Sequence, residues 1–111
     1  MRRALSLIAP LLVTMSSASF AQEGRILFLN AAKGGCTNCH QVPSDPTIKS
    51  LSSIGPKLVG VKEKYPTPEA LDAAIGDFEN QKPGSFMPPY RKHRLLTDAE
   101  IAAIARYVWT L

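Results

Sequence analysis

The sequence predicts a small all-α domain with long loops. Two segments place apolar residues along one face of a helix, and no segment alternates with the period of two that marks a strand. A chain of 111 residues allows one domain, and 45% hydrophobic content excludes a disordered tail. The two apolar stripes consist of Leu71, Ala74, Ile75 and Phe78 in one segment and of Ile101, Ile104, Ala105 and Val108 in the other.

Each expected helix has local start or stop signals. The first is expected over residues 23–33, which are rich in helix formers and end at a glycine pair. The second begins at Thr67, a good N-cap that is followed by Pro68 at the first helical position. The third begins with the capping box of residues 97–100.

Two proline-rich or polar segments separate these helices. Residues 41–54 hold two prolines and many Ser, Thr and Asp residues, and residues 81–89 hold three prolines and a glycine. Both are expected to be loops. Three short helices with long loops bury little apolar surface, so a domain of this size is expected to need a metal, a disulfide or a cofactor.

Residues 1–21 are predicted to be a signal peptide that is removed. Arg2 and Arg3 are followed by a short apolar run, and small residues precede Gln22, so we expect cleavage after Ala21. A membrane-spanning helix needs ~20 apolar residues, and this run has about half that number. The arginine pair could indicate twin-arginine export, but its surroundings favour general secretion. We therefore expect periplasmic location and no membrane span in residues 22–111.

The charge balance first suggests an acidic partner. The chain has 13 Lys and Arg against 9 Asp and Glu, a formal charge of +4, which would suit nucleic acid or an anionic membrane surface. Removing 21 of the 111 residues leaves 90 and lowers the charge to +2. Met87 is then the one methionine that remains.

The sequence Cys36-Thr37-Asn38-Cys39-His40 has the spacing of a c-type haem attachment site. One tight turn can present both thiols to the two vinyl groups of a porphyrin. The histidine directly after the second cysteine then lies where its imidazole can bind iron. Covalent haem would also supply the stabilisation that a domain of 90 residues lacks.

Other interpretations of these residues remain open at this point. A disulfide of the thioredoxin type would suit an exported protein, but no βαβ pattern accompanies it. Zinc could take four ligands, although two of them are adjacent and the histidines lack zinc-motif spacing. The third alternative is that this spacing of cysteines and histidine arises by chance. The four zinc ligands would be Cys36, Cys39, His40 and His93.

The second axial iron ligand is expected to be Met87. A thioether ligand must be held from a rigid backbone, and Pro88 and Pro89 follow this methionine directly. A methionine is more often core packing, but a proline-rich loop is a poor place for a core residue. His93 lies in a basic run and is interpreted as a surface histidine.

The motif Gly55-Pro56-Lys57-Leu58 is expected to support the iron-binding histidine. A histidine bound to a metal normally donates its other N–H to a carbonyl or carboxylate. We expect the Pro56 carbonyl to accept this bond from His40, with Leu58 packing on the haem. The alternative is an ordinary turn.

The mature chain resembles the class I cytochromes c along essentially its whole length. The resemblance rests on the motifs above and on Gly24, Phe28 and Tyr107. It implies a small cytochrome c fold, wrapped around one covalent haem, in which the first and last helices cross. The glycine lets them approach, and the two aromatic residues pack beside the crossing.

A narrower resemblance is to SoxX, the monohaem subunit of SoxAX sulfur-oxidation cytochromes. It rests on residues 87–101, on Gly76-Asp77, on residues 82–86 and on residues 55–61 with Lys64-Tyr65. This resemblance implies that His40 and Met87 bind iron and that Cys36 and Cys39 carry the haem.

The partners implied are a SoxA-like subunit with one or two haems, the SoxYZ carrier and a downstream soluble cytochrome c. SoxAX joins thiosulfate to a carrier cysteine as an L-cysteine S-thiosulfotransferase, with the chemistry in SoxA. The SoxX-like chain would act as the electron carrier. A free-standing shuttle and a haem enzyme or sensor with an open iron site are the alternatives. Two haem propionates would offset the remaining charge, so nucleic acid is not expected as a partner.

Overall fold

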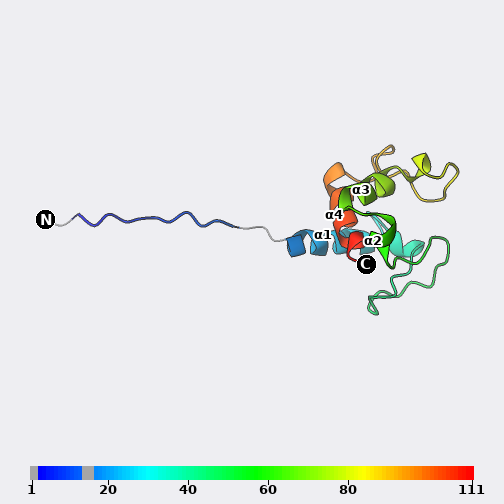
Figure 1. Cartoon of the computed structure of the whole chain (residues 1–111), viewed down its shortest axis with the longest axis horizontal. Coiled ribbons are helices and arrows are strands. Elements are labelled where there is room, and N and C mark those ends of the chain that lie inside the picture. Colours follow the sequence, from blue (N-terminus) through cyan, green and yellow to red (C-terminus); the bar gives the residue numbers. More distant parts are fainter. Residues whose placement is uncertain (1–2, 14–16) are drawn as a thin grey trace.

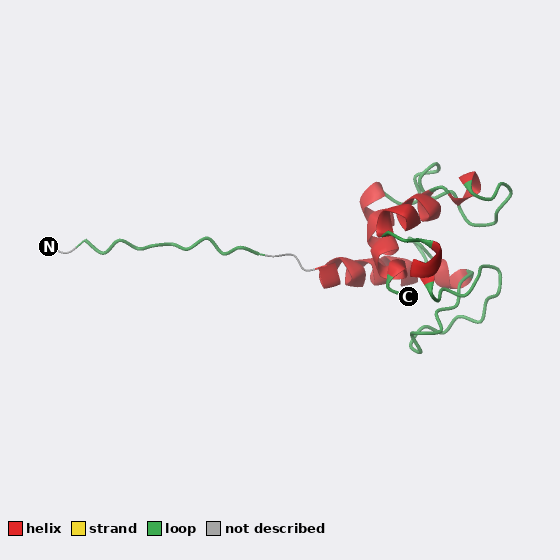
Figure 2. Cartoon of the chain, in the orientation of Figure 1, coloured by secondary structure: helices red, strands yellow, loops and turns green. Residues whose placement is uncertain are grey.

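The computed structural model describes residues 3–13 and 17–111, and it is helical with no strand in these ranges (Figure 2). This confirms the predicted all-α class with three to four short helices. Two 3₁₀ turns accompany the helices, η1 over Cys36–Asn38 and η2 over Phe78–Asn80. The four α-helices are α1 (Ser17–Leu29), α2 (Val61–Lys64), α3 (Pro68–Gly76) and α4 (Asp98–Trp109).

Residues 3–13 run as an extended segment away from the helices, with their side chains exposed (Figure 1). They belong to the predicted signal peptide, whose residues 1–2 and 14–16 lie outside the described ranges. Cleavage after Ala21 stays a prediction. No helix in the described part of the chain combines the length and the apolar character needed to cross a membrane.

Helix α1 differs at both ends from the helix expected over residues 23–33. It begins at Ser17, and the Phe20 ring in its first turns lies 5.2 Å from the Arg106 guanidinium of α4. It ends at Leu29 because Asn30 starts a turn, in which its backbone carbonyl accepts from Lys33 N at 3.0 Å. The Asn30 side chain also accepts from Ala32 N at 2.9 Å, which competes with helix continuation.

Helices α1 and α4 cross at Gly24, as the resemblance to the class I cytochromes c implies. A Cβ atom there would overlap the backbone carbonyl of Ala103, so only glycine allows this approach. Beside the crossing, the Phe28 and Tyr107 rings meet edge to face, with centroids 5.2 Å apart. Phe28, Ile101 and Ile104 are the largest fully buried side chains of the described residues.

Local caps explain where α3 and α4 begin. The Thr67 hydroxyl accepts from Ala70 N at 3.1 Å, and Pro68 occupies the first helical position of α3. In α4 the Thr97 hydroxyl accepts from Glu100 N, while the Glu100 carboxylate accepts from Thr97 N. Both predicted helix starts are confirmed.

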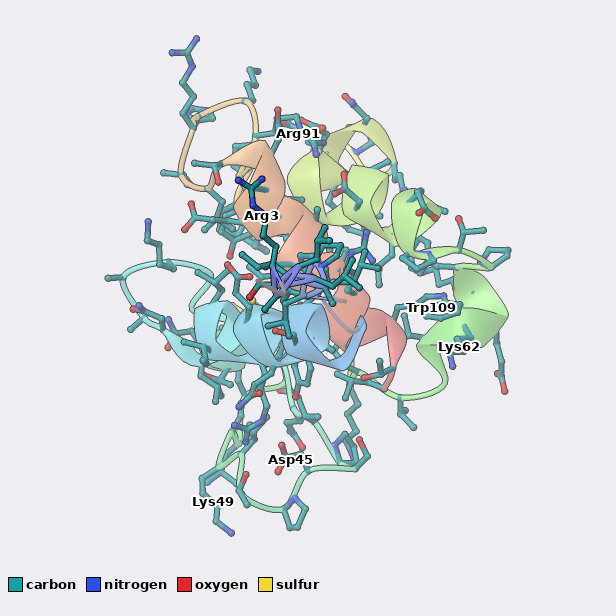
Figure 3. All side chains as sticks on the ribbon, turned by 90° about the vertical axis from the view of Figure 1, so that its left-hand side faces the viewer. Arg3, Asp45, Lys49, Lys62, Arg91 and Trp109 are labelled. Atoms are coloured by element: carbon teal, nitrogen blue, oxygen red, sulfur yellow. The ribbon has the colours of Figure 1, made fainter. Side chains whose placement is uncertain are left out.

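Helix α2 was not predicted from the sequence, because it is one turn held by distant contacts. Gly60 precedes it in the left-handed region, with φ of 62°. Its Lys62 ammonium lies 4.4 Å from the centre of the Trp109 ring, and the Trp109 indole N–H donates to the Tyr65 carbonyl at 3.1 Å (Figure 3). Both contacts join α2 to the end of α4.

The two long loops extend beyond the helices on the side opposite the N-terminal segment (Figure 1). The core lies between α1, α3, α4 and the chain that leads into α4. Several apolar side chains of the loops are instead exposed, including Leu51 at 96% and Phe86 at 92%. The helices therefore form one packed side of the molecule, and the loops leave apolar surface uncovered.

Candidate functional site

The two cysteines lie on one tight turn that follows α1. Gly35 enters the turn in the left-handed region, with φ of 56°, which favours glycine. Inside it, Cys39 N and His40 N both donate to the Cys36 carbonyl, at 3.1 and 2.8 Å. A Cβ atom at Gly34 would lie 2.9 Å from Cys36 Sγ, so this glycine leaves room for the thiol. The turn presents both thiols from a backbone of defined shape.

Both cysteines are free thiols and partly buried. Burial raises the pKa of the Cys36 thiol to about 12, so it stays protonated at neutral pH. A redox-active dithiol needs a cysteine with a lowered pKa as its nucleophile. The environment of Cys36 is the opposite, and it disfavours the thioredoxin-like alternative.

His40 is oriented by the chain that passes over it. Its Nδ1 lies 2.7 Å from the Pro56 carbonyl oxygen, which is the contact expected from the sequence. A carbonyl can only accept, so Nδ1 carries the proton and donates it. In the neutral imidazole, Nε2 is then the nitrogen with a free lone pair, which is the form that binds a metal.

Backbone hydrogen bonds attach residues 55–58 to the residues directly before and after this histidine. Gly55 N donates to the Cys39 carbonyl at 2.8 Å, and Leu58 N donates to the Gln41 carbonyl at 2.9 Å. A Cβ atom at Gly55 would lie 2.5 Å from His40 Cε1, so only glycine lets the backbone pass this close to the ring. Leu58 is partly buried and packs against the core.

Met87 lies on the other long loop, partly buried and packed against the core. Its backbone N–H donates to the Ser85 hydroxyl at 3.2 Å. Three residues later, the buried Tyr90 hydroxyl donates to the Gly34 carbonyl at 2.6 Å. Tyr90 thus connects the loop that carries Met87 directly to the turn that carries the two cysteines.

Sequence reasoning missed Tyr90 and Arg91 as parts of the site. The Arg91 guanidinium binds three carboxylates, those of Asp72, Asp77 and Asp98. The partners lie 7 to 19 residues away in sequence, so no local motif indicates them. The other six Lys and Arg residues between positions 57 and 94 are exposed: Lys57, Lys62, Lys64, Lys82, Lys92 and Arg94.

The zinc alternative finds no support in the described ranges. No three Cys, His, Asp or Glu side chains there gather into a group that could hold a metal ion. His93, which would supply the fourth zinc ligand, is exposed on the turn before α4.

The residues present fit a covalent haem. Two partly buried thiols lie on one turn, and the next residue is a histidine with a free Nε2 atom. Gly55 makes the close passage over the imidazole that a Cβ atom would block. Apolar loop side chains such as Ile54 and Val59, 69% and 62% exposed, offer surface for a porphyrin to cover.

These features define a small helical protein built to carry covalently attached haem. Comparison with known proteins gives the family: the cytochrome c family model matches residues 21–111, and the chain belongs to that family. Membership implies covalently bound haem c and a role in electron transfer.

One curated relative is an uncharacterized lipoprotein from Aquifex aeolicus (strain VF5). It is 38% identical over 76 residues, which cover 68% of this chain and 36% of the relative. The chain therefore spans little more than a third of the length of that protein.

Proposed function

We propose that this chain carries electrons through one haem c whose axial ligands are His40 and Met87, with Cys36 and Cys39 as thioether attachments. The observation that carries the proposal is the hydrogen bond from His40 Nδ1 to the Pro56 carbonyl, 2.7 Å long. This bond leaves Nε2 as the only ring nitrogen able to bind iron. The proline-rich loop supports Met87 as the second ligand, because it restricts the backbone on that side.

The bound haem would supply a one-electron couple, and methionine as a ligand raises its potential relative to two histidines. With His40 and Met87 both bound to iron, no position on the iron would remain open for a substrate. Pro56 and Leu58 would orient and cover the site. The chain alone is then an electron carrier and not a catalyst.

Replacing Met87 by alanine tests the ligand assignment. The ferric protein is expected to show the weak long-wavelength absorption of a methionine–iron bond, and Met87→Ala should abolish it. His93→Ala is the control and should leave the band intact. A wild-type spectrum without this band, or one unchanged by Met87→Ala, contradicts the assignment and favours an enzyme or sensor with an open iron site.

The finer proposal is that the chain is the SoxX subunit of a SoxAX complex. The residues that support it lie around Met87 and Gly55, where the sequence resembles SoxX. A SoxA-like subunit would then be the direct partner, and electrons released when thiosulfate joins a SoxYZ cysteine would reach this haem. The chain would be part of a thiosulfotransferase without performing its chemistry, and a soluble cytochrome c would accept the electrons.

Purification of the tagged chain from periplasm tests this finer proposal. We expect a heterodimer with a second c-type cytochrome, identified by mass spectrometry, and reduction of the haem on addition of thiosulfate with the carrier. A monomer that remains alone beside an active SoxA would favour a free-standing shuttle.

We also propose export by the N-terminal signal peptide, which agrees with the usual location of cytochrome c domains outside the cytoplasm. The intact mass of the purified protein tests cleavage and haem attachment together. Cleavage after Ala21 and addition of one haem give a single expected mass. A mature protein that begins elsewhere would contradict the predicted cleavage site.

A further inference from the structure

Arg91 lies at the centre of a cluster that joins three parts of the chain. Its Nη2 lies 2.7 Å from Asp72 on α3, its Nη1 lies 2.7 Å from Asp77 after α3, and its Nε lies 2.9 Å from Asp98 at the start of α4. All three guanidinium nitrogens are used. Figure 3 shows Arg91 between the α3 ribbon and the first turn of α4.

The backbone is built around the same guanidinium. Arg91 N donates to the Gly76 carbonyl at 3.1 Å, and a Cβ atom at Gly76 would overlap the guanidinium of Arg91. The side chain therefore lies directly against the end of α3. Asp72 and Asp77 are only 26% and 30% exposed, so these two ion pairs are partly shielded from water.

Tyr90, the residue before Arg91, is held by a different set of contacts. The Tyr90 hydroxyl donates to the Gly34 carbonyl beside the cysteine turn, and Leu95 N donates to the Tyr90 carbonyl at 2.9 Å. Tyr90 and Arg91 thus attach one point of the chain to the haem-attachment turn and to α3 and α4.

Only two residues, Pro88 and Pro89, separate this point from Met87. Each proline ring restricts φ to about −65°, so the two act as a stiff spacer. The Pro88 and Pro89 carbonyls accept from Tyr90 N and His93 N, at 2.9 and 3.0 Å, which restricts the spacer further. The backbone position of Met87 therefore depends on the attachment of residues 90 and 91.

We propose that Arg91 is a positioning residue for Met87: its cluster with Asp72, Asp77 and Asp98 holds the proline spacer and keeps the thioether available to iron. The inference rests on the proposed ligation by Met87. Lysine can replace arginine only in part here, because one ammonium lacks the planar fork that reaches three carboxylates in different directions.

Competition by added imidazole measures this positioning in the ferric holoprotein. Imidazole can bind iron only when Met87 is displaced, so its apparent affinity reports how firmly the methionine is held. We expect the affinity to rise about tenfold in Arg91→Ala and less in Arg91→Lys. The methionine–iron band should weaken in the same order, and the reduction potential should fall.

Arg25→Ala is the matched control. Arg25 makes a comparable partly exposed cluster with Asp45 and Thr47, at 2.8–3.1 Å, but on the loop of residues 41–54. Its removal should leave imidazole affinity unchanged. Urea unfolding of both variants separates a loss of positioning from a general loss of stability. Equal effects of the two substitutions on imidazole affinity would overturn the inference.

Met87→Ala distinguishes this inference from the ligand assignment on which it rests. If Met87 binds iron, Met87→Ala should bind imidazole more tightly than any Arg91 variant, since no competitor remains. Affinity equal to that of the wild type in Met87→Ala would overturn the ligation itself. Tighter binding in Met87→Ala with wild-type affinity in Arg91→Ala would overturn the positioning role alone.

Discussion

At three glycines of this molecule, the absence of a Cβ atom allows another part of the chain to approach closely. At Gly24, Gly55 and Gly76 a neighbouring group occupies the place that a Cβ atom would need. The neighbours are the Ala103 carbonyl, the His40 ring and the Arg91 guanidinium, respectively. One glycine thus sets the helix crossing, another the position of the His40 ring, and the third the attachment of the Met87 loop.

Gly24→Ala is expected to destabilise the protein. The new methyl group would meet the backbone of α4, which cannot move aside as a flexible side chain could, so the helices must separate. Overpacking of this kind costs about 1–3 kcal/mol in free energy of unfolding. Urea unfolding of the holoprotein measures it. Glu23→Ala, an exposed change at the preceding residue of α1, should stay within about 0.5 kcal/mol of the wild type. A Gly24→Ala protein as stable as that control would contradict the tight crossing.

Tyr90→Phe is expected to cost about 1–3 kcal/mol, because the buried Gly34 carbonyl loses its donor. Tyr65→Phe removes an exposed bond to Gln81, 3.2 Å long, and should cost less. Burial raises the pKa of Tyr90 to about 12.

The raised pKa of Tyr90 predicts how the stabilities of the wild type and of Tyr90→Phe differ with pH. The native state favours the neutral phenol, so the stability it contributes is present below about pH 10 and is lost as pH rises toward 12. Unfolding measured between pH 9 and pH 12, on the order of these pKa values, should show a smaller alkaline loss in Tyr90→Phe than in the wild type. Parallel curves for the two proteins would contradict a buried, neutral Tyr90.

At the scale of elements, the predictable features are those with local causes. The caps at Thr67 and Thr97 and the two loops could be identified from neighbouring residues alone. Helix α2 could not, because its lysine and its backbone contact Trp109, more than forty residues away. The expected first helix was placed too late and continued too far, since the Asn30 turn and the Phe20–Arg106 contact were not anticipated.

The candidate site also combines features with local causes, which the sequence predicts, and features that depend on distant contacts. The Cys36–His40 motif lies on one tight turn, so its spacing alone indicated it. The Pro56 carbonyl lies 16 residues from His40 and was expected because a metal-bound histidine normally donates its other N–H to a carbonyl or carboxylate. The Arg91 cluster depends on how α3 and α4 pack, which brings Asp72 and Asp98 to one guanidinium from distant positions. Local sequence pattern does not predict which distant residues such packing brings into contact.

Thr97→Ala tests the capping of α4. Loss of the hydroxyl should cost about 1 kcal/mol in free energy of unfolding, because Glu100 N loses its acceptor. Thr97→Ser keeps the acceptor and should stay close to the wild type. Hydrogen bonds from Thr97 N and Lys33 lower the pKa of Glu100, so its contribution is present above about pH 4.5 and is lost as pH falls. Equal stability of the Ala and Ser variants would contradict the capping box.

At the scale of the whole molecule, the packed core is one-sided. The buried apolar side chains belong mainly to α1, α3, α4 and residues 90–96, whereas the loops contribute little more than Val42. Leu51, Ile54, Val59 and Phe86 are more than 60% exposed. Burial of apolar surface contributes roughly 25 cal/mol per Å², so covering these loops would matter greatly to a domain of this size. The haem c of the family is the group that would cover them.

Replacing both Cys36 and Cys39 by serine should therefore remove more than the attachment bonds. Without covalent haem, the loops keep their apolar side chains in water, and we expect a protein that binds a hydrophobic dye and unfolds without a sharp transition. Thr37→Ala is the control, since it lies between the cysteines and leaves both thiols in place. It should retain haem, cooperative unfolding and low dye binding. A double serine variant that unfolds cooperatively, within about 1 kcal/mol of the holoprotein, would show that the helices alone form a sufficient core.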